Sequence, residues 1–152
     1  MCIRDRYEAF HLQIEWAVQY RLPIVIHSRD SMKESIGVVR EHRVQGVRGV
    51  FHCFGASVED ARAIVDLGFF LGIGGVLTYK NSLLPEVLRE IPLESLVLET
   101  DAPYLAPVPY RGKRNEPAYL RYVVERLAEV KGVSVEDVAA VTTANAEKLF
   151  GG

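Results

Sequence analysis

The sequence has few cysteines, little net charge and no long apolar run. Two cysteines among 152 residues, Cys2 and Cys53, are too few for a disulfide framework. We therefore expect a reducing, cytoplasmic location. No apolar run reaches the roughly 20 residues that a membrane-spanning helix needs. A formal net charge of −2 excludes a basic surface over the whole molecule, so any anion site must depend on a local cluster of cations.

Short apolar segments alternate instead with amphipathic helical segments. The apolar segments cover residues 24–27, 49–54, 69–75 and 95–101. Helical patterns cover 7–20, 31–42, 57–68, 81–90, 115–132 and 134–150. Ser57 and Ser134 are predicted N-caps, Pro85 predicts a late start or a bend, and the last helix is expected to break near Thr142. Because uniformly apolar strands are typical of parallel sheets, the alternation predicts an α/β sheet or barrel of about four strand–helix units.

Imidazole and carboxylate side chains stand where three of these apolar segments end. His27 closes the first, His52 nearly closes the second, and Glu99 and Asp101 close the fourth. The carboxyl ends of parallel strands share one rim, and these ligand types suit a divalent metal. Each residue alone also allows a structural interpretation, as a hydrogen-bonded histidine or as a carboxylate that caps a helix or forms a turn. Cys53 follows His52, but neighbouring strand residues face opposite ways, so we interpret Cys53 as a core residue.

Two loops raise further possibilities. Arg111, Lys113 and Arg114 crowd the stretch "PYRGKRNEP" before a predicted helix start, where charge and helix N–H groups could hold phosphate oxygens. By charge alone, a solvated basic loop is the simpler interpretation, but this loop follows the strand that ends in "ETD". The stretch "GIGGVL", residues 72–77, lacks the third glycine of a dinucleotide loop, so we interpret it as a tight exit from a strand.

The motifs together resemble the TatD-related deoxyribonucleases. "IHSRD", "HCFGAS", "GIGGVLTYKN", "ETDAPYLAP" and "RGKRNEP" occur in the family's order and approximate spacing, and the closing "NAEKLF" is similar to its end. The resemblance implies a TIM barrel that uses one or two divalent ions, Mg²⁺, Mn²⁺ or Zn²⁺, to cut phosphodiester bonds in DNA. It implies metal-ligand roles for His27, His52 and Asp101, with Asp101 also positioning the attacking water. Glu99 matches the acidic residue beside that site, and the polar loop near the substrate phosphate matches Arg111, Lys113 and Asn115.

The sequence also departs from the family pattern. A full member begins with a strand that carries a His-x-His pair and later supplies a glutamate, and neither is present here. The other histidines, His11 and His42, lie 31 positions apart on predicted helices. The resemblance therefore implies a partial TIM-type (β/α)8 barrel, strands five to eight. Residues 7–152 are expected to form this carboxyl-terminal half, and residues 1–6 a non-native or disordered prefix.

Three hypotheses for function follow. The first is a TatD-type nuclease, truncated here and nearly inactive alone, with DNA as substrate and the amino-terminal half of the barrel as missing partner. The second is an amide- or ester-cleaving metal hydrolase on the same kind of barrel; the basic loop after "ETD" favours phosphate substrates instead. The third is a non-enzymatic half-barrel that pairs with another chain. For the isolated fragment, unpaired strand edges and a half-covered apolar interior predict self-association or aggregation.

Overall fold

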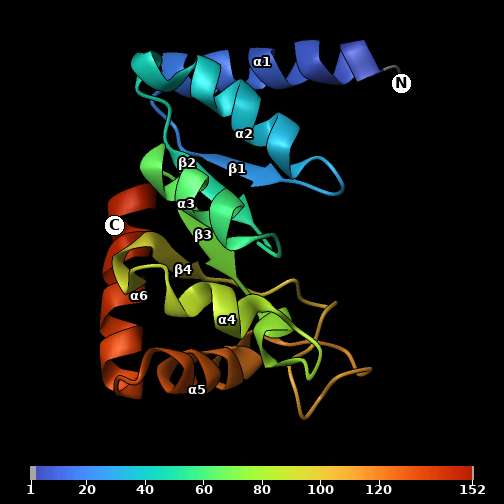
Figure 1. Cartoon of the computed structure of the whole chain (residues 1–152), viewed down its shortest axis with the longest axis vertical. Helices are drawn as coiled ribbons and strands as arrows, with labels where there is room; N and C mark the ends of the chain where they lie inside the picture. Colours follow the sequence, from blue (N-terminus) through green and yellow to red (C-terminus); the bar gives the residue numbers. More distant parts are fainter. Residues whose placement is uncertain (1–2, 152) are drawn as a thin grey trace.

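The computed structural model describes residues 3–151 and contains one parallel sheet of four short strands (Figure 1). Its order is β1 (Ile24–His27), β2 (Gly49–His52), β3 (Phe70–Ile73) and β4 (Leu96–Leu98). Neighbouring strands in the sheet are consecutive in sequence, and each crossover contains a helix. This confirms the predicted α/β fold with a parallel sheet. That the strands correspond to strands five to eight of a barrel stays a prediction.

Within residues 3–151, six α-helices accompany the sheet. They are α1 (Ile3–Gln19), α2 (Met32–Glu41), α3 (Val58–Asp66), α4 (Leu84–Arg89), α5 (Leu120–Lys131) and α6 (Val135–Phe150), and four short 3-10 turns lie between them: η1 (Arg43–Gln45), η2 (Gly75–Thr78), η3 (Leu93–Ser95) and η4 (Pro117–Tyr119). The two predicted serine caps are confirmed, because Ser57 Oγ accepts from the Asp60 backbone N–H at 3.2 Å and Ser134 Oγ from that of Asp137 at 3.0 Å.

Several helix boundaries differ from the predictions. Helix α1 begins at Ile3 rather than residue 7, so residues 3–6 are helical, whereas residues 1–2 lie outside the described part; the non-native origin of the prefix stays a prediction. The predicted break near Thr142 is wrong. Helix α6 continues through Thr142, whose hydroxyl donates to the Val138 carbonyl at 2.8 Å and so finds its partner inside the helix. Helix α4 starts only at Leu84, next to the proline.

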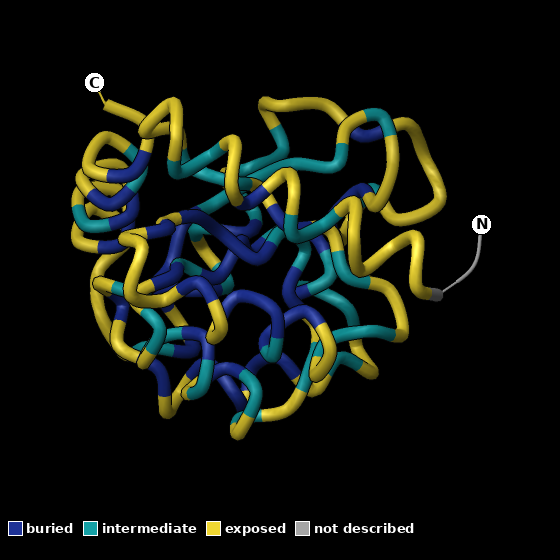
Figure 2. Tube along the Cα trace, turned by 90° about the horizontal axis from the view of Figure 1, so that it is seen from above, coloured by how far each residue is buried: buried dark blue, intermediate teal, exposed yellow. Residues whose placement is uncertain are grey.

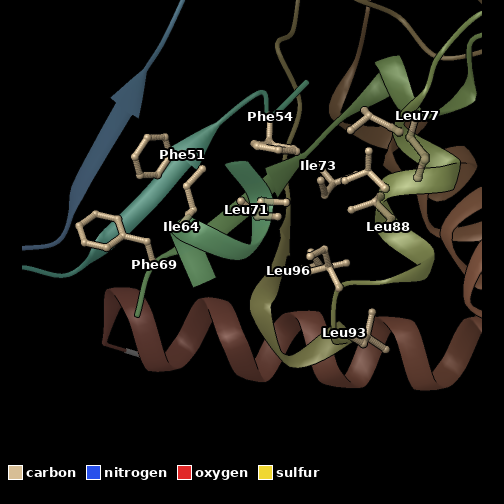
Figure 3. Close-up of a cluster of buried hydrophobic side chains, with 14 of the residues drawn as sticks. Phe51, Phe54, Ile64, Phe69, Leu71, Ile73, Leu77, Leu88, Leu93 and Leu96 are labelled. Carbon is tan, nitrogen blue, oxygen red and sulfur yellow. The ribbon is translucent and has the colours of Figure 1, made fainter. Parts of the chain in front are cut away.

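The core lies on both faces of the sheet. One face carries Phe51, Leu71 and Leu96, which pack with side chains from the helices (Figure 3). Alternate residues Val50 and Val97 face the other way and form a smaller buried cluster with Leu149 of α6. Figure 2 shows the buried trace in the middle of the molecule and the exposed trace around it. The strands are therefore covered on both faces over part of their length, which explains their uniformly apolar sequences.

A pair of histidines joins the first helix to the end of α2, in addition to the core packing of Ile14. His11 of α1 places Nδ1 at 2.7 Å from Nε2 of His42, which follows α2 and lies 3.0 Å from Gln45 through Nδ1. His42 is buried, so its two ring nitrogens have their partners inside the protein. The pair links two helices and lies apart from the strand-end residues. Within residues 3–151, no helix combines the length and the apolarity that crossing a membrane demands.

Candidate metal centre at the strand ends

The predicted site residues meet at the carboxyl ends of the strands. His27 and His52 are the last residues of β1 and β2 and are register partners in the parallel pairing. Their ring centroids lie 6.0 Å apart. Glu99 and Asp101 follow β4, at the far side of the sheet, and their side chains reach back toward β2. His52, Glu99 and Asp101 thus come together at one rim with His27 beside them, whereas the metal-ligand roles of these residues stay predictions.

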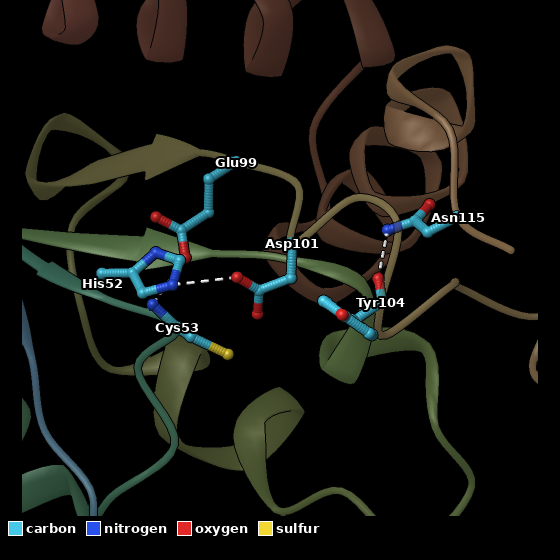
Figure 4. A network of polar contacts seen from close by, with 6 residues as sticks. All are labelled: His52, Cys53, Glu99, Asp101, Tyr104 and Asn115. Carbon is cyan, nitrogen blue, oxygen red and sulfur yellow. Dashed lines mark hydrogen bonds and ion pairs between the residues drawn. The ribbon is translucent and has the colours of Figure 1, made fainter.

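His52 stands between the two carboxylates (Figure 4). Its Nδ1 lies 2.8 Å from Glu99 Oε1, and its Nε2 lies 2.9 Å from Asp101 Oδ1. All three side chains are 18–24% exposed, so the cluster is shielded but reachable from solvent. With an acceptor at each ring nitrogen, the imidazole can donate twice, which is the hydrogen-bonding pattern of the protonated ring.

The environment of His52 changes its pKa through opposing causes. Burial lowers the pKa because it disfavours the charged ring, but the hydrogen bond and charge of Glu99, together with those of Asp101, outweigh burial. The net result is that the pKa of His52 is raised above 6.5. The two carboxylates that face the ring therefore favour its protonated form.

Glu99 reaches His52 because a glycine lies beneath it. A Cβ built on Gly72 of β3 would come within 2.2 Å of Glu99 Oε2, so any other residue there would occupy the place of the carboxylate. The backbone N–H of Glu99 donates to the Ile73 carbonyl at 3.1 Å, which continues the β3–β4 ladder past the strand end. Glu99 Oε1 also accepts from the backbone N–H of Cys53. These contacts fix the carboxylate on the Nδ1 side of the ring.

The interpretation of Cys53 as a core residue is wrong. Strand β2 ends at His52, and Cys53 adopts a left-handed backbone with φ of 48°, so the alternation rule no longer applies to it. The residue is half-buried beside Asp101 (Figure 4). Burial, followed by the hydrogen bond and charge of Asp101, raises the pKa of the Cys53 thiol to about 12. The side chain is therefore a neutral thiol at the site and no candidate nucleophile.

The donor set fits a divalent ion in its chemistry. A histidine that binds a metal through one ring nitrogen almost always donates the other N–H to a carboxylate or carbonyl. Glu99 takes that second role at Nδ1, which leaves Nε2 of His52, the adjacent Asp101 carboxylate and the neighbouring His27 as candidate ligands. Within residues 3–151, no three such side chains are already arranged around one common ion position. The described residues thus supply part of a coordination shell.

The loop after Asp101 gives Asn115 a different position from the predicted one. Asn115 is 3% exposed; its amide donates to the Tyr104 carbonyl at 2.7 Å and accepts from the Glu116 N–H at 2.9 Å. Its own N–H donates to the Pro103 carbonyl at 3.0 Å. With these bonds made inside the loop, Asn115 holds the loop together, and the structure does not support direct contact with substrate.

The cations of this loop lie on its surface. Arg111 is exposed, and its guanidinium stacks over the Tyr79 ring at 4.4 Å from the centroid. Lys113 is also exposed and lies 6.0 Å from the Tyr110 ring centroid. Burial raises the pKa of Tyr79, the residue whose ring the Arg111 guanidinium covers. The predicted roles of Arg111 and Lys113 in substrate binding stay predictions.

Comparison with known proteins identifies a family for the chain. A family model described as "TatD related DNase" matches residues 4–151. The chain belongs to that family. The match covers almost the whole chain and does not distinguish which half of a barrel the chain would represent.

TatD relatives resemble the chain in sequence and in structure. An uncharacterized metal-dependent hydrolase, YabD of Bacillus subtilis, is 45% identical over 144 residues, which cover 94% of this chain and 56% of that protein. The 3'-5' ssDNA/RNA exonuclease TatD of Citrobacter rodentium is 37% identical, with 94% of this chain and 57% of that protein covered. The crystal structure of YjjV, a TatD homologue from Escherichia coli K12, matches with a TM-score of 0.85 at 32% identity, covering 91% of this chain and 53% of that one. The chain spans about half the length of these TatD relatives.

Sequence reasoning missed three contributors to the site. In the sequence, Gly72 indicates only the end of a strand. Nothing near it in the sequence predicts that the Glu99 carboxylate packs on it. The alternation rule that predicts a core position for Cys53 holds only within strands, and β2 ends at His52. Tyr104 lies three residues after Asp101, and its backbone N–H donates to the Asp101 carbonyl at 2.6 Å. Its position next to "ETD" was the signal that could have found it.

Proposed function

We propose that the chain carries part of the metal centre of a TatD-type deoxyribonuclease that cuts phosphodiester bonds in DNA. The observation that carries this proposal is the bracketing of His52 by Glu99 and Asp101 at the carboxyl rim of the sheet. The family is shown by the match over residues 4–151, and its relatives are metal-dependent hydrolases by name. The phosphodiester substrate is supported by the exposed cations of the loop that follows the same strand.

Each residue has a proposed task. His27, His52 and Asp101 would hold a divalent ion, Mg²⁺, Mn²⁺ or Zn²⁺, and Glu99 orients His52 through Nδ1. When bound, such an ion lowers the pKa of a water molecule and polarises a phosphoryl oxygen. Asp101 lies at the open side of His52, where its carboxylate can accept a hydrogen bond from the attacking water and orient it. Arg111 and Lys113 would hold the phosphate backbone.

Further ligands are proposed to come from outside these residues. Strand β1 has β2 as its neighbour on one side, and Val25 in its middle is 55% exposed. A cavity of about 710 Å³ lies along this edge, lined by Val25, His27 and the facing side of α1. We propose that the amino-terminal half of a barrel occupies this edge and completes the metal shell, and that the chain without it self-associates and has little activity.

Two alternatives remain to be separated by experiment. An amide- or ester-cleaving hydrolase would use the same metal centre, but it gives no role to Arg111 and Lys113. A non-enzymatic half-barrel would pair with another chain without hydrolysis. A panel of single-stranded DNA, a peptide amide and a carboxylic ester distinguishes the three hypotheses. The nuclease should cleave the DNA, the alternative hydrolase should cleave the amide or the ester, and the non-enzymatic half-barrel should cleave none of them.

The experiment that tests the proposal is reconstitution. The chain is assayed for digestion of labelled single-stranded DNA with Mg²⁺, Mn²⁺ or Zn²⁺, alone and mixed with the amino-terminal half of a TatD relative. We expect chelator-sensitive cleavage on mixing, its loss in Asp101→Ala, and no loss in the exposed control Asp66→Ala on α3. No cleavage of DNA under any of these conditions would contradict the nuclease proposal, and robust cleavage by the chain alone would contradict the need for further ligands.

A further inference from the structure

An aromatic ring beside the metal centre is left in solvent. Tyr104 is 73% exposed although it lies three residues after Asp101. Leu105 and Val108 of the same loop are 42% and 45% exposed. Large apolar side chains that are exposed together beside a polar site are typical of binding surfaces. The exposed Tyr104 ring and its apolar neighbours therefore fit a ligand with a flat apolar face.

The backbone under this ring is held on several sides. The Tyr104 N–H donates to Asp101, and the Tyr104 carbonyl accepts from the buried Asn115 amide at 2.7 Å (Figure 4). Leu105 adopts φ of 52°, a conformation that costs free energy in a residue other than glycine and persists where its surroundings fix it. Its carbonyl packs directly on Gly75, where a Cβ would come within 2.2 Å. The loop thus presents Tyr104 from a fixed backbone.

The next element also anchors the loop. Tyr79, which follows η2, donates from its hydroxyl to the Ala106 carbonyl at 3.1 Å, and Thr78 Oγ1 accepts from the Val108 N–H at 2.9 Å. Arg111 stacks on this same Tyr79 ring. The backbone after Tyr104 is therefore held by Tyr79, on which Arg111 stacks. The Tyr104 carbonyl is held by Asn115, which follows Lys113 and Arg114 in sequence.

We propose that Tyr104 is a base-contacting residue, whose ring stacks against an unpaired nucleobase while the neighbouring phosphates lie along Arg111, Lys113 and Arg114. This inference rests on the proposed nuclease function and assigns a specificity-determining residue to it. Rings with a free face next to cations are the arrangement that binds single strands, because each base offers a π-face and each phosphate a charge. Inside a duplex both faces of a base are already stacked on neighbouring bases, so the base offers no free face to the Tyr104 ring. Asn115 is then a positioning residue, which acts on substrate through Tyr104.

The test is binding of oligonucleotides in EDTA, where no metal-dependent cleavage can occur. Fluorescence anisotropy compares a labelled single-stranded 10-mer, an abasic 10-mer with the same phosphates and the duplex of the same sequence at low salt. We expect Tyr104→Ala to weaken binding of the intact strand by about 5- to 150-fold, and Tyr104→Phe to retain it. Binding of the abasic strand and of the duplex should not change in either variant.

A second readout reports stacking itself. 2-Aminopurine placed in turn at the terminal positions of the strand should be quenched on binding by the original chain and by Tyr104→Phe, but not by Tyr104→Ala. Tyr20→Ala is the matched control, because Tyr20 is 64% exposed and precedes β1, at the amino ends of the strands. Thermal unfolding of each variant verifies that the fold is kept, as expected for exposed rings.

The outcomes separate this inference from the proposed function. Salt-dependent binding that is equal for intact and abasic strands, and unchanged in Tyr104→Ala, would overturn the stacking role and leave the nuclease proposal standing. No binding of any oligonucleotide at low salt would contradict the nucleic-acid substrate and the stacking role together.

Discussion

Glu99 holds Nδ1 of His52 at 2.8 Å and thereby fixes which ring nitrogen remains for other partners. The Nε2 atom then faces Asp101 at 2.9 Å, at the open rim of the sheet. This order of carboxylate, imidazole and second carboxylate is the pattern in which an outer acid orients a metal-binding histidine. It follows that Glu99 should affect metal binding without itself touching the ion.

Replacing Glu99 by glutamine tests this role. Glu99→Gln keeps the shape of the side chain but removes the charge that supports the Nδ1–H bond. We expect metal affinity to fall by about 10- to 100-fold, the usual effect of losing such a partner. Isothermal titration with Zn²⁺ or Mn²⁺ measures this affinity, and Glu94→Gln, a change at an exposed residue of η3, serves as control. Equal affinities in the three proteins would remove Glu99 from the metal centre.

Gly72→Ala should have a similar effect from a distance. The new Cβ would come within 2.2 Å of Glu99 Oε2, and the flexible carboxylate can move away more cheaply than the strand can. We expect the fold to survive and metal affinity to fall by about 10- to 100-fold. Gly74→Ala is the matched control, because its Cβ would stay 3.4 Å from the nearest atom, the Glu99 carbonyl oxygen. If both variants bind metal like the original chain, Glu99 does not depend on Gly72.

The Cys53 thiol should react slowly in the folded protein. A pKa of about 12 keeps it protonated at pH 8.5, and the thiolate is the form that iodoacetamide attacks. In a Cys2→Ser background, where Cys53 is the remaining cysteine of the sequence, alkylation should be much slower in buffer than in urea. Mass spectrometry over time measures both rates. Equal rates would show that burial and Asp101 do not protect this thiol.

The stability of the metal-free chain should depend on the protonation of His52. Its folded-state pKa is raised, so the protonated ring stabilises the fold fully at pH values below the ordinary 6.5. This contribution is lost as pH rises through the folded-state pKa. Urea unfolding in EDTA from pH 5 to 9 measures the difference in unfolding free energy between the original chain and His52→Gln. We expect this difference to decrease as pH rises. A constant difference across this range would mean that the carboxylates do not hold the proton.

Much of the fold and of the site could be predicted because the signals are local. Apolar runs gave the four strands, and serine caps gave the starts of α3 and α6. Parallel strands bring their carboxyl ends together, so histidines and carboxylates at those ends had to meet. The pairing of His27 with His52 in register follows from equal placement on neighbouring strands.

The rest depends on contacts between distant segments. Helix α6 continues past Thr142, whose buried hydroxyl is satisfied by the Val138 carbonyl one turn earlier, and the composition does not show this contact. Asn115 is buried in a loop rich in charge because three of its bonds are made within the loop. Cys53 turns into the site because its backbone adopts a positive φ after the strand has ended. Neither periodicity nor residue type predicts such loop conformations.

The most direct test of the central claim is a crystal structure of the chain soaked with Mn²⁺ or Zn²⁺, with the ion placed by anomalous scattering. The account predicts an ion bonded to Nε2 of His52 and to the Asp101 carboxylate at about 2.0–2.2 Å, with His27 turned toward it and Glu99 still on Nδ1. An ion bound elsewhere, or His52 still bridging Glu99 and Asp101 without an ion at millimolar metal, would contradict it.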